Sequence, residues 1–425
     1  MQNTHFPKRG TPWPEVRQRM NAKRGQDVKW QEGRMLTSSY VIDDQHVAML
    51  REANGDFLVE NAIYAGEFAK KPGTGFTSLV DFRDELLKMV LELFNAPEGA
   101  GGTLTSGGTE SILLAVLGAR EWARKNKPHI TKPRLLLPRT AHPAFNKAAF
   151  YYGLEVTRIH EGPDFRADVK AMEAALTDDV VLMAGGAPCY PFGIIDPLTE
   201  LSEVAAKRNV WFHVDACVGG YLAPFVKKLG YPVPDFDLSV PGVWSMSADL
   251  HKYGFAPKNI SSVLYRDASL RRYSTFDFDE WPAGSYATAG TGGSRTGGPI
   301  AAAWALFHVM GEEGYLKAAK TIMDTRQKLF DGLARIGGFK VQGEPHLGLV
   351  RYGSDDFDIT AVADGLDERG WSTGRGLDPD AIINLINPIN SKSIDKYVAD
   401  LGEVTAAVRS GRLKRGATQA VYTSS

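Results

Sequence analysis

Short, nearly continuous runs of hydrophobic residues recur through the middle of the chain, and helical or loop-like stretches mostly separate them. The six runs are Arg134–Leu137, Leu154–Thr157, Val180–Met183, Val210–Val214, Val243–Met246 and Ser262–Tyr265. Runs of this kind are typical of strands that are buried on both faces of a parallel sheet. The pattern therefore predicts an α/β fold with a mostly parallel sheet, helices on both faces and functional loops at the strand ends.

The flanking regions follow other patterns. Helical spacing of apolar residues predicts a helix over 80–93, which Asn95-Ala96-Pro97 ends, and a glycine-rich loop after it. Beyond Gly311, long charged helices and two short strands predict a smaller α+β domain. We expect three parts: an N-terminal arm over residues 1–55, a large domain over 56–310 and a small C-terminal domain over 311–425.

Composition narrows the possible partners. The chain has 425 residues, and its 49 Lys+Arg against 50 Asp+Glu give a net charge of −1. This balance offers no electrostatic reason to expect nucleic acid or an anionic membrane as a partner. The two cysteines, Cys189 and Cys217, form no C-x-x-C pair, which suits a reducing compartment. Because no apolar run approaches the roughly eighteen residues of a membrane span, we expect a soluble, cytoplasmic protein without an integral membrane segment.

The strongest chemical signal is a lysine that follows a histidine in the segment Ser245–Tyr253. An amine such as that of Lys252 can hold pyridoxal 5′-phosphate covalently. An aspartate such as Asp215 can keep the pyridine nitrogen of that cofactor protonated, so that the ring draws electrons from the substrate. The pair predicts an enzyme that breaks bonds at the carbon next to an amine, with a small-molecule amine or amino acid as substrate.

Two further motifs fit this chemistry, and each has a plainer interpretation. The Ser106–Thr109 loop precedes a helical stretch, where glycines, hydroxyls and free amides favour a phosphate; alternatively, it is a glycine-rich loop before a capped helix. His142 follows a predicted strand, where its imidazole could stack on the cofactor ring and transfer a proton. Alternatively, His142 only caps a helix.

A metal site is a competing hypothesis for part of the same region. His213 and Asp215 share one strand face, and His251 is a third candidate ligand near them in the predicted fold. A metal hydrolase would leave Lys252 and the Ser106–Thr109 loop unexplained. We therefore expect no metal.

Six ordered blocks resemble the pyridoxal-phosphate-dependent sphingosine-1-phosphate lyases, which lie within the broader group II amino-acid decarboxylases. The blocks are Thr105–Ser111, Ala141–Ala148, Gly193–Pro197, His213–Gly220, Ser247–Lys258 and Gly293–Gly298. The resemblance implies the aspartate aminotransferase fold, also called fold type I, with a seven-stranded sheet. It also implies a homodimer whose active sites lie at the subunit interface.

The resemblance assigns roles to individual residues. It implies that Lys252 binds the cofactor covalently, Asp215 pairs with the pyridine nitrogen and His142 stacks on the ring. The groups implied around the cofactor phosphate are Ser106, Gly107, Gly108, Thr109, Ser247 and His251, with Gly297 reaching the phosphate of the partner subunit. Tyr190 and Lys258 are implied near the reacting substrate as acid or base. The implied reaction is retro-aldol cleavage between Cα and Cβ of a β-hydroxy amine or its phosphate, giving an aldehyde and, from a sphingoid phosphate, ethanolamine phosphate.

One departure from the family pattern concerns the substrate. Tyr64 stands where the lyases carry a histidine, and a tyrosine has no positive charge to offer a substrate phosphate. The alternative reaction is α-decarboxylation of an L-amino acid, which needs a partner for the substrate carboxylate; Arg375, Arg34 and Lys258 are the candidates. A non-catalytic scaffold is a third hypothesis, and the intact Lys252 argues against it.

Overall fold

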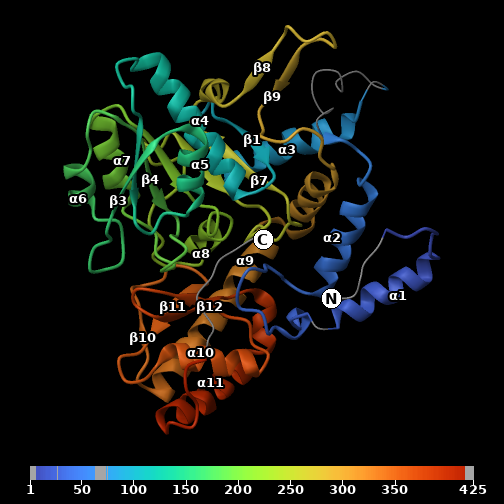
Figure 1. Ribbon diagram of the computed structural model, residues 1–425, viewed down its shortest axis with the longest axis vertical. Helices are drawn as coiled ribbons and strands as arrows, with labels where there is room; N and C mark the ends of the chain where they lie inside the picture. Colours follow the sequence, from blue (N-terminus) through green and yellow to red (C-terminus); the bar gives the residue numbers. More distant parts are fainter. Residues whose placement is uncertain (1–5, 26, 63–72, 74, 417–425) are drawn as a thin grey trace.

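The computed structural model describes residues 6–25, 27–62, 73 and 75–416, and it contains a large sheet and a small sheet (Figure 1). The large sheet has seven strands in the order β1-β7-β6-β5-β4-β2-β3. Their bounds are β1 Gly101–Thr105, β2 Arg134–Pro138, β3 Glu155–Ile159, β4 Val180–Gly186, β5 Trp211–Asp215, β6 Ser245–Ala248 and β7 Ser261–Tyr265. Only β7 runs against the other six, so the predicted mostly parallel seven-stranded sheet is confirmed.

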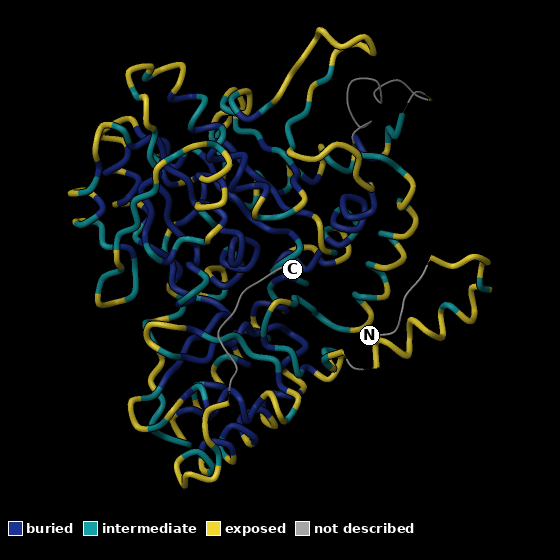
Figure 2. The backbone as a smooth tube through the Cα atoms, in the orientation of Figure 1, coloured by how far each residue is buried: buried dark blue, intermediate teal, exposed yellow. Residues whose placement is uncertain are grey.

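Helices cover both faces of this sheet, as the pattern predicted. Along β2, Leu135 and Leu137 pack against the helices of one face, whereas Leu136 between them packs on the other, as the period of a strand requires. In Figure 2, these strands lie in the dark blue, buried interior together with the inner sides of the helices that cover them. One face carries α4 (Gly108–Asn126) and α5 (Ala144–Tyr152). The other carries α3 (Thr77–Leu93), α7 (Leu198–Lys207), α8 (Ala223–Lys228) and the first half of α9 (Gly298–Ile336).

Two expectations about the strands were wrong in detail. The glycine-rich loop expected after the first long helix contains β1, an edge strand of small residues. A Cβ on Gly102 would lie 2.7 Å from Leu264 Cδ2 on β7, so the glycine allows the close strand approach that the pattern did not reveal. The run Val243–Met246 begins two residues before β6, because Val243 closes a turn with its N–H on the Val240 carbonyl.

The C-terminal part of the chain builds the small sheet, in the order β10-β11-β13-β12 with every pair antiparallel. Its elements are β10 Lys340–Val341, β11 Leu349–Gly353, α10 Ile359–Glu368, β12 Gly374–Gly376, β13 Ala381–Leu385 and α11 Ile394–Arg409. The long helix α9 joins this part to the large sheet and is interrupted at Gly311, whose φ is 53°. The same apolar core continues from one sheet to the other, so the domain boundaries stay a prediction.

Two segments extend from the surface. Helix α1 (Trp13–Arg24) has no buried residue and stands away from the body, and the hairpin β8–β9 (Phe276–Phe278 and Tyr286–Thr288) projects above the sheet (Figures 1 and 2). By contrast, α2 (Asp44–Asp56) packs against α9. Among the described residues, no helix has the length and apolarity that crossing a membrane requires.

Candidate active site

Loops that follow five strands meet at one edge of the large sheet and enclose a cavity of about 430 Å³. They follow β1, β2, β4, β5 and β6, which all run in the same direction. A cavity of this size can hold one small molecule and part of a second one that reacts with it. Ten of the residues predicted for the site line it: Ser106, Gly107, Gly108, Thr109, His142, Tyr190, Asp215, His251, Lys252 and Lys258.

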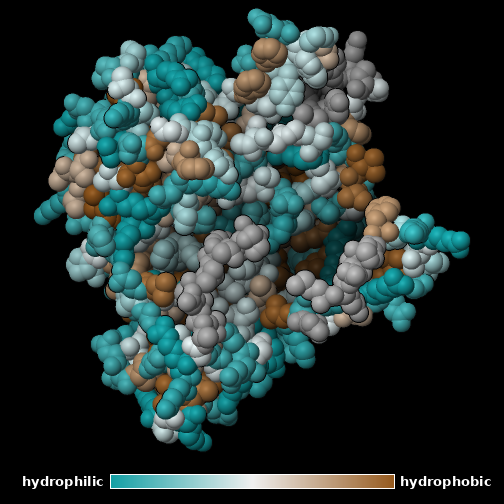
Figure 3. All heavy atoms as spheres, viewed as in Figure 1, coloured by the Kyte–Doolittle hydropathy of each residue, from teal (hydrophilic) through white to brown (hydrophobic). Residues whose placement is uncertain are grey.

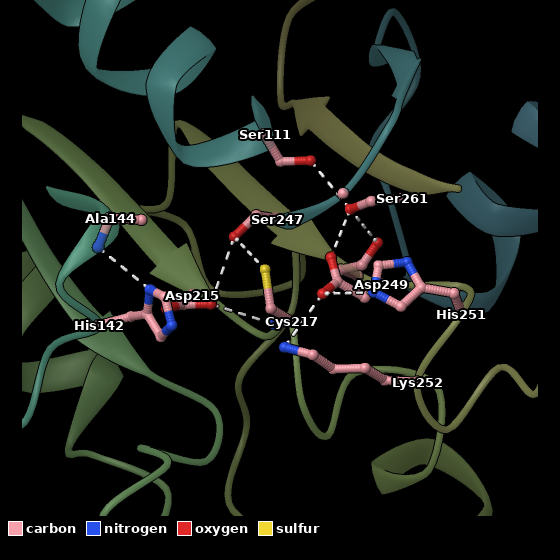
Figure 4. Close-up of polar contacts among 12 residues, drawn as sticks. Ser111, His142, Ala144, Asp215, Cys217, Ser247, Asp249, His251, Lys252 and Ser261 are labelled. Carbon is pink, nitrogen blue, oxygen red and sulfur yellow. Dashed lines mark hydrogen bonds and ion pairs between the residues drawn. The ribbon is translucent and has the colours of Figure 1, made fainter. Parts of the chain in front are cut away.

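Lys252 lies just after β6, and its amine points toward Asp249 (Figure 4). Lys252 Nζ is 3.0 Å from Asp249 Oδ2, and Asp249 is only 2% exposed. Burial lowers the pKa of Lys252, but the charge and hydrogen bond of Asp249 and the charges of Cys217 and Asp215 together raise it more, so the pKa lies above that of an ordinary lysine. Lys252 is therefore an ammonium ion in this arrangement.

A chain of buried hydroxyl groups leads from the first turn of α4 to Asp249 (Figure 4). Ser261 Oγ lies 2.5 Å from Asp249 Oδ1, Ser111 Oγ lies 2.9 Å from Ser261 Oγ, and Thr105 Oγ1 lies 2.6 Å from Ser111 Oγ. An ionised carboxylate only accepts hydrogen bonds, so each hydroxyl donates toward Asp249. Burial raises the pKa of Asp249. The charges of Lys252 and His251 and the hydrogen bonds from Ser261 and Lys252 together lower this pKa by more, so it lies below its usual value.

Asp215 ends β5 in the wall of the cavity. Its Oδ1 accepts a hydrogen bond of 3.1 Å from the backbone N–H of Cys217 and one of 3.5 Å from the Ser247 hydroxyl. Ser247 itself is fully buried behind the wall and receives the Cys217 thiol at 3.2 Å. Ser247 therefore contacts the site through Asp215 and Cys217, and its predicted contact with a cofactor phosphate stays a prediction.

His213 lies in the same buried layer, away from the cavity wall. Its Nδ1 is 2.8 Å from Ser245 Oγ, and its Nε2 is 3.1 Å from Ser247 Oγ. Burial lowers the pKa of His213 to about 4, so the ring is neutral. Both nitrogens are thus taken up by serine hydroxyls, and no three His, Cys, Asp or Glu side chains within the described ranges are grouped as a metal site.

His142 lines the cavity from the loop between β2 and α5. Its Nδ1 accepts a hydrogen bond of 3.1 Å from the backbone N–H of Ala144, which leaves the proton of the neutral ring on Nε2. Burial lowers the pKa of His142 and favours this neutral form. Arg158 holds the loop, since its Nη1 donates to the carbonyls of Arg139 at 2.8 Å and Ala141 at 2.9 Å.

The glycine loop lies at the start of α4, where the free N–H groups of the first turn favour an anion. A Cβ on Gly108 would lie 2.7 Å from Cys217 Sγ and 2.8 Å from Asp249 Oδ2, so only glycine fits there. A Cβ on Gly107 would have its closest contact 3.6 Å away, at His251 Cε1. The loop and His251 thus form one continuous wall.

Glu110, which the sequence analysis did not single out, links this loop to a distant segment. One of its oxygens accepts from the N–H and hydroxyl of Ser106 at 2.6 and 2.7 Å. The other oxygen accepts from the N–H and hydroxyl of Thr291 at 2.7 and 2.9 Å. Ser106 therefore donates to Glu110 in this structure, and its predicted role in holding a phosphate stays a prediction.

Lys258 and Tyr190 also line the cavity. The Lys258 amine donates to the Ser38 carbonyl at 3.2 Å and lies 5.5 Å from the ring centre of Tyr40. Partial burial of the amine and the charge of Lys252 lower the pKa of Lys258. Tyr40, from the N-terminal segment, was missed by the sequence analysis, because nothing in its local pattern links it to Lys258.

The remaining predicted residues lie elsewhere. Gly297 is buried at the start of α9, where a Cβ would lie 2.5 Å from Leu79 Cδ1, and it does not line the cavity. Arg375 pairs with Asp364 at 2.8 Å, and Arg34 donates to the Arg369 carbonyl at 2.9 Å. Of the three candidate carboxylate partners, Lys258 is thus the one that lines the cavity. Tyr64 lies outside the described residues.

Comparison with known proteins agrees with this arrangement. The model of the pyridoxal-dependent decarboxylase conserved domain matches residues 76–353, which is more than half of the chain. The chain belongs to this family. Among pyridoxal-dependent relatives, the sphingosine-1-phosphate lyase of Arabidopsis thaliana is 36% identical over 93% of this chain and 72% of its own length. A probable L-tyrosine/L-aspartate decarboxylase of Methanothermobacter thermautotrophicus is 33% identical over 87% of this chain and 95% of its own length.

A solved structure extends the likeness to three dimensions. The sphingosine-1-phosphate lyase of Burkholderia pseudomallei superimposes with a TM-score of 0.90 at 36% identity, over 96% of this chain and 94% of that chain. The expected fold type I, the resemblance to the lyases and membership of the pyridoxal-dependent decarboxylase family are confirmed. The chain is an enzyme of the lyase class, and its cofactor is pyridoxal 5′-phosphate.

The residues in the cavity fit that cofactor. One cavity is surrounded by four kinds of group: a lysine amine, an aspartate at a strand end, a neutral imidazole, and the start of a helix with a glycine that no larger residue can replace. These are the groups that an aldehyde, a pyridine nitrogen, an aromatic ring and a phosphate need. Asp249 and Glu110 add two carboxylates that the sequence analysis overlooked; their spacings, Asp249–Lys252 and Ser106–Glu110, were the available signals.

Proposed function

We propose that this enzyme cleaves the bond between Cα and Cβ of a β-hydroxy amine, or of its phosphate ester, and releases an aldehyde. The observation that carries the proposal is a second lysine, Lys258, in the same cavity as Lys252. A retro-aldol cleavage needs a base for the proton of the β-hydroxyl, and a lysine whose pKa is lowered supplies one. The identity of 36% to two sphingosine-1-phosphate lyases supports a long-chain amine phosphate as substrate.

Pyridoxal 5′-phosphate supplies, when bound, an aldehyde that can hold an amine and a ring that takes up the electron pair of the broken bond. Lys252 is the group that would hold the cofactor covalently. Asp215 would keep a proton on the pyridine nitrogen, and the buried Ser247 would keep the Asp215 carboxylate in place. His142, fixed by Ala144 and by the Arg158 clamp on its loop, would lie against the ring as a neutral imidazole.

The remaining residues bind the substrate and move protons. Lys258 in its neutral form would take the proton from the β-hydroxyl oxygen, and the Tyr190 hydroxyl is the second candidate for that transfer. The start of α4, with Gly107, Gly108 and Thr109, offers N–H groups to the cofactor phosphate. Buried apolar residues of the cavity lining, among them Ile112, Phe145 and Val218, exclude water, so the charges act in a medium of low dielectric constant.

Product analysis tests the proposal. The cofactor-loaded enzyme is incubated with sphinganine 1-phosphate, and hexadecanal and ethanolamine phosphate are measured by mass spectrometry. We expect both products from the native enzyme and neither from Lys252→Ala. The absence of both products, together with carbon dioxide release from one of a panel of L-amino acids, would replace the lyase by a decarboxylase.

Decarboxylation of an L-amino acid is the second candidate, and one relative named as a probable decarboxylase supports it. That reaction needs a cation for the substrate carboxylate. Arg375 and Arg34 are engaged with groups outside the cavity, which leaves Lys258 among the three candidates. If Lys258 holds a carboxylate, Lys258→Gln should raise KM for an amino acid far more than it lowers kcat.

We also propose that the enzyme acts as a homodimer with shared active sites. The support is apolar surface that a single chain leaves exposed: Trp13 is 60% exposed, Phe276 58% and Trp281 53%. Figure 3 shows a hollow bordered by hydrophobic atoms between the projecting arm and the body. Light scattering should give twice the chain mass of 46.4 kDa, and Trp281→Ser should weaken the association. A mass of one chain would contradict the proposed homodimer.

The cytoplasmic location stays a prediction.

A further inference from the structure

One buried charge in the cavity has no part in the mechanism above: the carboxylate of Asp249. It lies 3.0 Å from the Lys252 amine through Oδ2, and the same oxygen is 3.6 Å from His251 Nε2. Its other oxygen receives the Ser261 hydroxyl at 2.5 Å. Asp249 therefore contacts the lysine on which the proposed function depends.

The surroundings of Asp249 hold it in the ionised form. A carboxylate that is 2% exposed has almost no water to solvate it, so its charge must be compensated by neighbouring groups. The directed chain from Thr105 through Ser111 to Ser261 supplies one donor, and the first turn of α4 at Gly108 packs directly against both oxygens. Lys252 supplies the positive charge.

An ion pair of this kind is usually only a structural feature, and buried pairs are weak evidence for stability. Here, however, the cation must lose its charge before it can react. A permanent structural pair and a reactive amine are incompatible roles for one lysine. The pair must therefore break when the cofactor binds covalently.

We propose that Asp249 is a positioning residue that holds Lys252 as an ammonium ion in the cofactor-free enzyme and so sets the pH at which the lysine takes up the cofactor. This inference rests on the proposed role of Lys252. Before attachment, Lys252 loses one proton to solvent, and its lone pair attacks the aldehyde carbon of the cofactor. The carbon–nitrogen bond forms, and the aldehyde oxygen leaves as one water molecule.

The sign of the effect follows from the balance of charges. Burial lowers the pKa of Lys252 and Asp249 raises it, with smaller contributions from the other charges that face it. Replacing Asp249 by asparagine removes the raising charge and leaves the burial. Uptake should therefore reach its full rate at lower pH. The other titratable groups that face the pair stay the same: Asp215, Cys217, His142, His251 and Lys258.

The test measures the rate of cofactor attachment across a pH series. Cofactor-free native enzyme and Asp249→Asn are each mixed with pyridoxal 5′-phosphate, and the visible absorbance of the attached cofactor is followed. We expect the inflection of the pH–rate curve to fall by about 1–3 pH units in Asp249→Asn. The same inflection in both proteins would overturn the proposal.

Matched variants separate charge from packing. Ser261→Ala removes a hydrogen bond to Asp249 but keeps the carboxylate, so its inflection should stay with the native enzyme; a shift equal to that of Asp249→Asn would overturn the proposal. Asp249→Ser gives a second uncharged variant if the asparagine variant does not fold. Native enzyme that never attaches the cofactor would refute the role of Lys252, and this inference with it. Normal attachment with an unshifted inflection would refute only the role of Asp249.

Discussion

The floor of the cavity and an exposed segment that is hydrogen-bonded to the cavity wall, here called the rim, differ in burial and in how they are held. The floor consists of Asp215, Ser247, Asp249, Lys252 and Ser261, which lie on or beside β5, β6 and β7 and bond to buried partners. The rim is our name for residues 291–296, which are exposed and do not line the cavity. Thr291 donates to Glu110, which does line it, and Arg295 donates to the Leu104 carbonyl.

This difference indicates which region suits the chemical step and which suits contact with a substrate or a second subunit. Groups that must change charge during a reaction need fixed partners and little water, because each charge then has a large effect on its neighbours. The floor offers this. A rim that is exposed in a single chain can adapt to a substrate or to a second subunit, and it needs only a few anchors.

The largest expected effect is the loss of the floor lysine. Lys252→Ala removes the amine that would bind the cofactor, so the visible absorbance should disappear and activity should fall by roughly 10⁴-fold or more. Thermal melting of the variant controls for folding. Retained absorbance and activity would show that the floor is not the reactive part.

A smaller effect is expected for the second lysine of the cavity, Lys258. Lys258→Met should keep the cofactor absorbance and lose roughly 10²–10⁴-fold in rate if Lys258 is the base. Because its pKa is lowered and only the neutral amine accepts a proton, kcat/KM should rise with pH through a value below that of free lysine. That rising limb should be missing in Lys258→Met. An unchanged profile would exclude Lys258 as the base.

Two glycines, one packed against the floor residue Asp249 and one on the rim, compare the two regions. Gly108→Ala places a methyl group 2.7 Å from Cys217 Sγ, whereas Gly292 on the rim has nothing within 4 Å. Overpacking costs about 1–3 kcal/mol, so Gly108→Ala should weaken cofactor affinity roughly 5- to 150-fold. Gly292→Ala is the matched control and should leave the dissociation constant unchanged. Equal effects of both substitutions would remove the distinction.

The smallest effect is expected at the link between the two regions. Glu110→Gln keeps the shape of the side chain but weakens four hydrogen bonds to Ser106 and Thr291. We expect faster amide hydrogen exchange over 289–296 and a loss of about 1 kcal/mol, roughly 5-fold, in cofactor affinity. Unchanged exchange in the rim would mean that Glu110 does not hold it.

The sequence predicted the floor better than the rim for a physical reason. Apolar runs mark parallel strands, and the residues that follow such strands meet at one edge of the sheet. The sequence therefore predicts that His142, Asp215 and Lys252 lie close together. Strand β1 was not predicted, because its glycines interrupt the run of apolar residues that marks a buried strand. The two-residue error at β6 arose because a buried turn is as apolar as a strand.

Contacts between distant segments carried no local signal. Thr291 reaches Glu110 across 181 positions of the chain, and Lys258 meets the Ser38 carbonyl across 220. The position of Asp249 three residues before Lys252 is a signal in the sequence, but its burial and its hydroxyl partners follow only from the pairing of β6 with β7. The roles of the individual site residues, the domain boundaries and the dimer stay predictions.

The most direct test is to find where the cofactor is attached. The holoenzyme is reduced with borohydride, which makes the bond to the lysine permanent, and is then digested and sequenced by mass spectrometry. We expect the added mass of the reduced cofactor on Lys252, at the floor. The same mass on Lys258 instead, or on no lysine of the cavity, would contradict it.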